Sequence, residues 1–388
     1  MFTYLTAGES HGPQLTAIIS GIPAGLSLSE DQINHDLTRR QQGYGRGRRM
    51  QIETDQIAFK SGVRFGKTTG NPLTLVILNR DWTNWKQEMS TSAADEDQAH
   101  PVTRPRPGHA DLAGCLKFNQ RDARNILERA SARETAIRVA VGAVCKALLQ
   151  SFSITIFSYV TAIGIHELKP EILQKDDEQL SILAESSLFR VPDPSLEGKL
   201  KESVDKAKQE GDSLGGRFRI IARGLPAGIG SHSQYDRKLD GRLAQAVMSI
   251  QAIKGVEIGL GFKAAQTPGS QVHDEINYEQ SRGFYHLSNN AGGIEGGISN
   301  GEDIIVTAAM KPIPTLYRPL QSVDLISKQP FQASVERSDT CAVPAAAVVG
   351  EAVVAIEIAR LLMEKFGGDF IEETRAHYQK YLDHLRTF

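Results

Sequence analysis

Several features that would point to common protein classes are missing from this chain of 388 residues. It has only three cysteines, Cys115, Cys145 and Cys341, which lie far apart and outside metal-ligand spacing, so we expect reduced thiols in a cytoplasmic protein. No apolar run reaches the length of a membrane span, because the nearest, 345–358, is interrupted by Gly350 and two glutamates. The first residues show no basic region before an apolar core, so we expect no secretory signal.

Strong charge of either sign is also missing. The formal net charge is −2, which argues against general affinity for nucleic acid or acidic membranes. The chain has no phosphate-binding loop, no dinucleotide-binding fingerprint and no hydrolase nucleophile elbow. Its histidines never fall at the spacing of a helical metal site, so we expect no metal.

The two halves of the chain resemble each other in three markers, which occur in the same order. Two are glycine turns, one of which leads into a β-branched run typical of a strand, and the third is a helix of small residues. We therefore expect a single domain over 1–388, built from pseudo-repeats at about 1–160 and 213–388. The paired segments are 21–29 with 224–233, 66–77 with 297–308, and 133–149 with 345–362.

Both small-residue helices are dense in alanine and valine and carry little polar surface. A helix that is apolar on most sides is buried on most sides. These helices predict an α+β fold, in which a central helical layer is sandwiched between antiparallel β-sheets. We expect an exposed insertion over 166–212, and a long solvated loop over 81–103 of the kind that often serves as a lid.

Positive charge is concentrated in the segment RRQQGYGRGRR at 39–49, which has five arginines and no acidic residue. Arginine forks suit phosphate and carboxylate groups, although a solvated loop or an RNA-binding segment remains an alternative. A second basic stretch is RPRPGHADL at 104–112. A third, ERASARETAIR at 128–138, opens a helix whose N-terminus favours anions, and its Ser131 and Glu134 have capping-box spacing.

The hexapeptide AGESHG at 7–12 places His11 between two glycines near the start of the chain. Gly8 and Gly12 allow the backbone to turn and to approach a ligand closely, and a histidine can change its charge near neutral pH. A surface turn with an incidental histidine is the alternative interpretation.

The second half adds a rigidly presented lysine and a glycine-rich loop. Two prolines in MKPIPT, 310–315, fix the backbone beside the lysine, and NNAGGIEGGISNG, 289–301, has too many glycines for the interior of a helix or strand. Asp339, taken on its own, reads as a helix cap. A pocket with arginines, two histidines, an aspartate and glycine loops would suit a small, multiply anionic substrate beside a planar cofactor.

Taken together, these segments resemble the chorismate synthase family along nearly the whole chain. The resemblance implies a lyase that eliminates phosphate, anti and 1,4, from 5-enolpyruvylshikimate 3-phosphate to give chorismate, the last step of the shikimate pathway to the aromatic amino acids. It also implies reduced FMN as an obligatory cofactor without net redox change, and a homotetramer. The segments are 8–12, 43–49, 61–72, 106–112, 129–135, 211–216, 255–262, 289–301, 311–315 and 337–346.

The same resemblance implies roles for individual residues. The catalytic ones are His11 as general acid, His109 beside the flavin ring, and Asp339 as the carboxylate that relays the proton removed from carbon. Arg48 is given no role. The substrate-binding residues are Ser10, Arg40, Arg46, Arg49, Arg106, Ser131 and Arg133, and the FMN-binding residues are Arg129, Ala130, Ser131, Gln251, Ala252, Gly296, Lys311, Pro312, Ile313, Pro314, Thr315 and Arg337.

Two other functions compete with this expectation. An FMN-dependent oxidoreductase acting on another phosphorylated acidic substrate would consume its reductant. An RNA-binding protein would use 39–49, but Tyr44 is the only aromatic residue interleaved with those arginines. Because no dinucleotide fingerprint is present, we expect an external flavin reductase, with NADPH as an indirect reductant.

Overall fold

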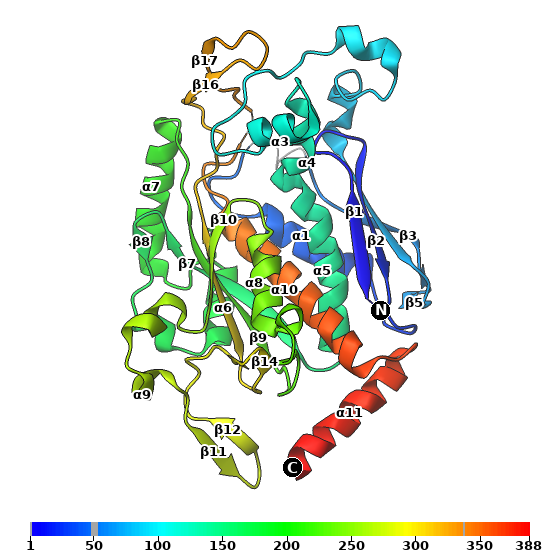
Figure 1. Ribbon diagram of the computed structural model, residues 1–388, viewed down its shortest axis with the longest axis vertical. Helices are drawn as coiled ribbons and strands as arrows, with labels where there is room; N and C mark the ends of the chain where they lie inside the picture. Colours follow the sequence, from blue (N-terminus) through cyan, green and yellow to red (C-terminus); the bar gives the residue numbers. More distant parts are fainter. Residues whose placement is uncertain (1, 48–52, 337) are drawn as a thin grey trace.

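Two antiparallel sheets enclose a layer of helices in the computed structural model, which describes residues 2–47, 53–336 and 338–388 (Figure 1). The first sheet has the order β1–β2–β6–β3, with β1 at Thr3–Ala7, β2 at Gln14–Ser20, β3 at Ile57–Ser61 and β6 at Leu73–Leu78. The second has the order β10–β15–β9–β7–β8, with β7 at Thr155–Ile163, β8 at His166–Glu167, β9 at Gly216–Arg223, β10 at Ile253–Ile258 and β15 at Ile304–Met310.

Two long helices, α5 (Thr135–Gln150) and α10 (Val343–Phe366), form the centre of the helical layer. They pack directly on each other, because a Cβ atom on Gly142 would lie only 2.4 Å from that of Ala352. Gly350 on α10 makes room for Phe218 and Ile220 of β9 in the same way. Helix α5 faces the first sheet and α10 faces the second. The expected α+β layering is confirmed.

The remaining helices surround this centre, and none in the described ranges is long and apolar enough to cross a membrane. The segment 166–212, expected as an exposed insertion, contains α6 and α7 and buries Leu180, Leu200 and Val204 in the common core. The helices are α1 (Glu30–Gln41), α3 (Asp111–Phe118), α4 (Arg124–Ala130), α6 (Asp177–Glu185), α7 (Glu197–Gln209), α8 (Leu239–Met248), α9 (Gly269–Val272) and α11 (Ile371–Thr387).

Four short hairpins complete the described part of the fold, and the long loop over 81–103 contains local structure. Two 3₁₀ helices, η1 (Arg80–Asn84) and η2 (Ala93–Gln98), overlap that loop. The hairpins are β4 (Val63–Arg64) with β5 (Lys67–Thr68), β11 (Ile276–Glu279) with β12 (Gly283–His286), β13 (Ile294–Glu295) with β14 (Ile298–Ser299), and β16 (Gln321–Val323) with β17 (Pro330–Gln332).

The first sheet and the second share a connectivity. The order β1–β2–β6–β3 has its counterpart in β7–β9–β15–β10, with β8 added at one edge. The turns that follow β2 and β9 are held by equivalent hydrogen bonds. Thr68 Oγ1 donates to the Pro23 carbonyl at 2.6 Å, and Ser299 Oγ donates to the Pro226 carbonyl at 2.6 Å. We propose that the two halves arose by internal duplication, with α5 and α10 as equivalent helices.

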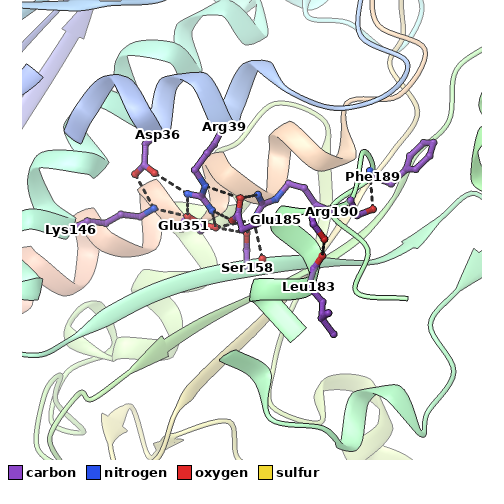
Figure 2. A network of polar contacts seen from close by, with 11 residues as sticks. Asp36, Arg39, Lys146, Ser158, Leu183, Glu185, Phe189, Arg190 and Glu351 are labelled. Carbon is purple, nitrogen blue, oxygen red and sulfur yellow. Dashed lines mark hydrogen bonds and ion pairs between the residues drawn. The ribbon is translucent and has the colours of Figure 1, made fainter. Parts of the chain in front are cut away.

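A network of buried charges joins the helical layer to the second sheet (Figure 2). Glu351 on α10 is fully buried and accepts hydrogen bonds from Arg39 Nη1 at 2.7 Å and Lys146 Nζ at 2.5 Å, with Arg190 Nη2 at 3.5 Å. Burial alone would raise the pKa of Glu351, but the three cations hold it far below its ordinary value. Because Arg39 precedes Arg40 on α1, the network fixes the end of α1 against α5 and α10.

Replacing Glu351 with Gln should destabilise the protein strongly, since three cations would lose their buried counter-ion. We expect a loss of about 3–5 kcal/mol in the free energy of unfolding, the usual cost of breaking a buried ion pair. Urea unfolding followed by circular dichroism measures it.

Asp383 provides the control, because its ion pair with Arg386, at 3.7 Å, is exposed. Asp383→Asn should cost less than about 1 kcal/mol. Equal small losses in the two variants would show that the network does not hold the layer together.

Candidate active site

A cavity of about 400 Å³ lies where the N-terminal ends of α5 and α10 meet. One part of its wall is apolar, and another is crowded with cationic side chains. Helix N-termini carry partial positive charge, so both the helices and the side chains favour an anion here. The expected site residues that line the cavity are Ser10, His11, Arg40, Arg46, Arg106, His109, Ala130, Ser131, Arg133, Gln251, Ala252, Lys311, Ile313, Pro314, Thr315 and Asp339.

Three expected site residues lie outside the cavity lining. Arg129 is partly exposed and donates to the carbonyls of Gly8 and Thr6, at 3.1 and 3.0 Å. Pro312 is exposed beside the cavity, and Gly296 is exposed in the turn between β13 and β14. None of these three is among the cavity-lining residues. Arg49 and Arg337 lie outside the described residues.

His11 lies in the turn between β1 and β2. The turn requires glycine at position 8, because φ there is +112° and a Cβ would lie 2.4 Å from the Gln14 carbonyl oxygen. Close packing of the chain against itself is therefore one reason for glycine at position 8. Asn79 holds the turn from outside, donating to the carbonyls of Glu9 and Gly12 at 3.2 and 2.7 Å.

Glu128 on α4 binds His11 at two points. One carboxylate oxygen accepts from the His11 backbone N–H at 2.7 Å, and the other lies 2.9 Å from His11 Nδ1. Burial would raise the pKa of Glu128, but the hydrogen bonds and charge of His11, together with Arg124, lower it overall. The Trp85 ring, from the 81–103 loop, lies over the imidazole with centroids 4.0 Å apart.

His109 has a similar arrangement with a buried aspartate. Its Nδ1 lies 2.5 Å from Asp111 Oδ1, and Arg106 Nε donates to the same carboxylate at 2.9 Å. Burial opposes ionisation of Asp111, but His109 and Arg106 outweigh it and hold the pKa of Asp111 well below its usual range. Arg106 also donates to Thr315 Oγ1 at 2.9 Å, so these residues fix one wall of the cavity.

The cavity arginines differ in how fully they are bound. Arg133 donates to both oxygens of Asp55, at 2.6 and 2.8 Å, and to Asn79. Arg40 Nη1 is buried without a hydrogen bond among the described residues, and an Asp55 oxygen lies 3.6 Å away. Burial, together with the positive charges of Arg46 and Arg133, lowers the pKa of Arg40 to about 10 against the attraction of Asp55. This guanidinium would gain most from a bound anion.

Asp339 does not cap α10, because the residue before that helix is Ala342, which makes no side-chain cap hydrogen bond. The carboxylate instead accepts from Arg46 Nη1 and from the Gly47 backbone N–H, each at 2.6 Å. The helix-cap interpretation was wrong, and the arginine-rich segment is the partner of Asp339.

The capping box expected from Ser131 and Glu134 is also replaced. Ser131 Oγ accepts from the Arg133 N–H at 3.3 Å and caps the 3₁₀ helix η3 (Ala132–Glu134). The Glu134 carboxylate instead accepts hydrogen bonds from Thr6 Oγ1 at 3.3 Å and from Gln251 Nε2 at 3.4 Å. Ser131 lies 3.2 Å from Ser10 Oγ, so the two expected substrate-binding hydroxyls are adjacent.

The comparisons with known proteins identify the family of the chain. The family model described as chorismate synthase matches residues 2–363. The chain belongs to the chorismate synthase family. Chorismate synthases of Geotalea daltonii and Geobacter sulfurreducens are 61% and 60% identical to it over the whole of both chains. That of Aquifex aeolicus is 56% identical, covering 99% of this chain and 98% of its own.

A crystal structure of a chorismate synthase matches the fold with a TM-score of 0.82 and 48% identity, covering 100% of this chain and 99% of the other. The expected fold class and the expected enzyme class, a lyase of aromatic amino-acid biosynthesis, are therefore confirmed.

Sequence reasoning missed three residues that hold the two histidines: Glu128, Asp111 and Trp85. Asp111 follows His109 by two residues inside a segment already singled out, and that short spacing was a usable signal. Glu128 is 117 residues from His11, so only the folded chain brings them together. In the described ranges, His, Cys, Asp and Glu side chains form no group of three suited to a metal.

Replacing Asp111 with Asn should remove a charged hydrogen-bond acceptor from His109 and Arg106. We expect a loss of about 1.5–3 kcal/mol in the free energy of unfolding at pH 7. Because folding lowers the pKa of Asp111, its contribution is full above the unfolded value, about 3.9, and is lost as the pH falls further.

Thermal or urea unfolding between pH 3 and pH 7 measures the difference between the two proteins. The difference in the free energy of unfolding between the unaltered protein and Asp111→Asn should decrease as the pH falls below about 4. A gap independent of pH would contradict the ionised state of Asp111.

Proposed function

We propose that the chain catalyses anti-1,4-elimination of phosphate from 5-enolpyruvylshikimate 3-phosphate, giving chorismate, with reduced FMN and no net oxidation. Membership of the chorismate synthase family supports this reaction. The observation that carries it is one cavity in which four arginines, a lysine and two carboxylate-held histidines surround the N-terminal ends of α5 and α10.

The cationic wall suits a substrate with one phosphate and two carboxylates. Guanidinium groups that are already fixed by protein carboxylates do not need to reorganise when charge develops on a leaving phosphate. Arg106 is fixed by Asp111, Arg46 by Asp339, and Arg40 keeps a buried N–H for which the anion would supply an acceptor.

The rest of the cavity suits the flavin. Leu127, Ile250, Met310 and Val349 give an apolar surface for a planar ring, and Gln251 Oε1 is buried without a hydrogen-bond partner among the described residues. When bound, reduced FMN supplies an electron-rich ring that can lend electron density to the substrate. The residues that would hold it here are Ala130, Ser131, Gln251, Ala252, Lys311, Ile313, Pro314 and Thr315, joined by Arg129, Pro312, Gly296 and Arg337 on the resemblance alone.

The histidines and Asp339 handle the protons in this proposal. His11, held by Glu128, is the general acid, since histidine is the side chain most often used to transfer a proton to a reacting group. His109 is held beside the flavin by Asp111. Asp339, fixed by Arg46 and Gly47, is the carboxylate through which the proton leaving the substrate carbon passes.

The assembly and the source of electrons are part of the same proposal. We propose a cytoplasmic homotetramer whose flavin is reduced by an external reductase, with NADPH as the indirect donor. The missing dinucleotide fingerprint in the sequence supports an external source. The whole-length match to chorismate synthases supports the same enzyme class.

Anaerobic turnover with reduced FMN tests the reaction. We expect phosphate release and chorismate absorbance in equal amounts, many times in excess of the flavin present, with the flavin still reduced at the end. Oxidation of one flavin per phosphate would contradict the proposal and favour the FMN-dependent oxidoreductase.

Replacing His11 with Ala should remove the general acid. We expect turnover to fall by roughly 10²–10⁴-fold. FMN affinity, measured by flavin fluorescence, should be preserved, which separates loss of the acid from loss of the cavity. Unchanged turnover would remove His11 from the mechanism.

A further inference from the structure

The contact between Glu128 and His11 carries an inference beyond the proposed reaction, although it rests on that reaction for its catalytic meaning. We propose that Glu128 is a positioning residue that keeps a proton on Nδ1 of His11. The proton that His11 exchanges with a ligand in the cavity is then the one on Nε2.

The two-point contact determines which ring nitrogen carries the proton. An ionised carboxylate has no proton to donate, so it can act only as a hydrogen-bond acceptor. One oxygen of Glu128 is engaged by the His11 backbone N–H at 2.7 Å, and the other lies 2.9 Å from Nδ1. An unprotonated Nδ1 would set its lone pair against the carboxylate, so the neutral imidazole must carry its proton there.

The surroundings keep Glu128 ionised and its geometry fixed. Its side chain is only 2% exposed, and Arg124 Nη1 donates to the oxygen nearest Nδ1 at 3.2 Å. The Arg124 guanidinium also lies over the Trp85 ring, 5.0 Å from its centroid, and Trp85 lies over His11. The Glu128 backbone carbonyl accepts from the Ser10 N–H at 3.0 Å, so one residue holds both Ser10 and His11.

The chemical consequence is a defined direction of proton transfer. In the acid step the Nε2–H bond of the imidazolium breaks, and its proton passes to an oxygen of the bound ligand. The neutral ring that remains keeps Nδ1–H against the Glu128 carboxylate. A histidine held in the opposite tautomer would keep its proton on Nε2 in the neutral ring, so its imidazolium would not release that proton to the ligand. The orienting carboxylate of such pairs has a large effect on rate for this reason.

The chain contains a matched control on its surface. Glu88 binds His100 in the same two-point way, with the His100 backbone N–H at 2.9 Å from one oxygen and Nδ1 at 2.7 Å from the other. His100 is 88% exposed and lies apart from the cavity lining. Glu88→Gln therefore repeats the chemical change at a histidine outside the cavity lining.

Neutron diffraction from deuterium-exchanged crystals at pH 8 locates the protons directly. In the unaltered protein we expect deuterium on Nδ1 of His11. In Glu128→Gln, the amide oxygen should keep the backbone N–H and the amide NH₂ should face Nδ1, which moves the deuterium to Nε2. Turnover should fall by roughly 10²–10⁴-fold, the usual range for a general acid, with KM little changed. Glu88→Gln should leave turnover unchanged.

Deuterium on Nε2 and not on Nδ1 in the unaltered protein would overturn the inference, even if the variant failed to fold. Deuterium remaining on Nδ1 in Glu128→Gln would overturn it as well, whatever the turnover. If the deuterium moves to Nε2 and turnover is unchanged, the positioning of His11 by Glu128 stands. The general-acid role of His11 in the proposed reaction then fails.

Discussion

The direct contact between α5 and α10 is the constraint on which the rest of the structure depends. Gly142 has no room for a Cβ beside Ala352, so the two helix axes lie closer than larger side chains would permit. This contact places the N-terminal ends of both helices at one cavity, and the two sheets then cover the outer sides of the pair. A fold whose centre is made of small residues thereby concentrates helix-end charge at a single site.

Carboxylates at the site turn that concentration of positive charge into a stable structure. Asp55 neutralises Arg133, Asp111 neutralises Arg106, and Asp339 neutralises Arg46, each within 3 Å. A cavity of unpaired arginines would carry a large desolvation cost, whereas these pairs hold the cations in place before any ligand arrives. Away from the cavity, Glu351 likewise neutralises Arg39 in the last turn of α1. Positioning in this molecule is therefore mostly electrostatic.

Much of this architecture could be predicted from the sequence, for identifiable reasons. The helical layer was predictable because α5 and α10 carry small apolar residues on most of their surface, and the sheets because β-branched runs follow glycine turns. The cationic segments were predictable from composition. What the sequence could not supply was pairing at long separation: Glu128 with His11 and Arg46 with Asp339 are brought together only by folding. Asp339 looked like a helix cap because its position before α10 was visible and its partner was not.

The duplicated connectivity explains why the site is asymmetric although the halves are alike. The turn after β1 carries Ser10 and His11, whereas the turn after β7 leads directly into the short strand β8. Both halves supply a helix N-terminus to the cavity, and the first also supplies His11 beside it.

The central claim is that one cavity, formed by the N-terminal ends of α5 and α10, holds both the anionic substrate and the flavin. A crystal structure of the enzyme with FMN and 5-enolpyruvylshikimate 3-phosphate tests it most directly. The account predicts both molecules in this cavity, with anionic groups on Arg40 and Arg46 and the flavin ring beside Gln251 and His109. Binding of either molecule elsewhere, with these side chains unchanged, would contradict it.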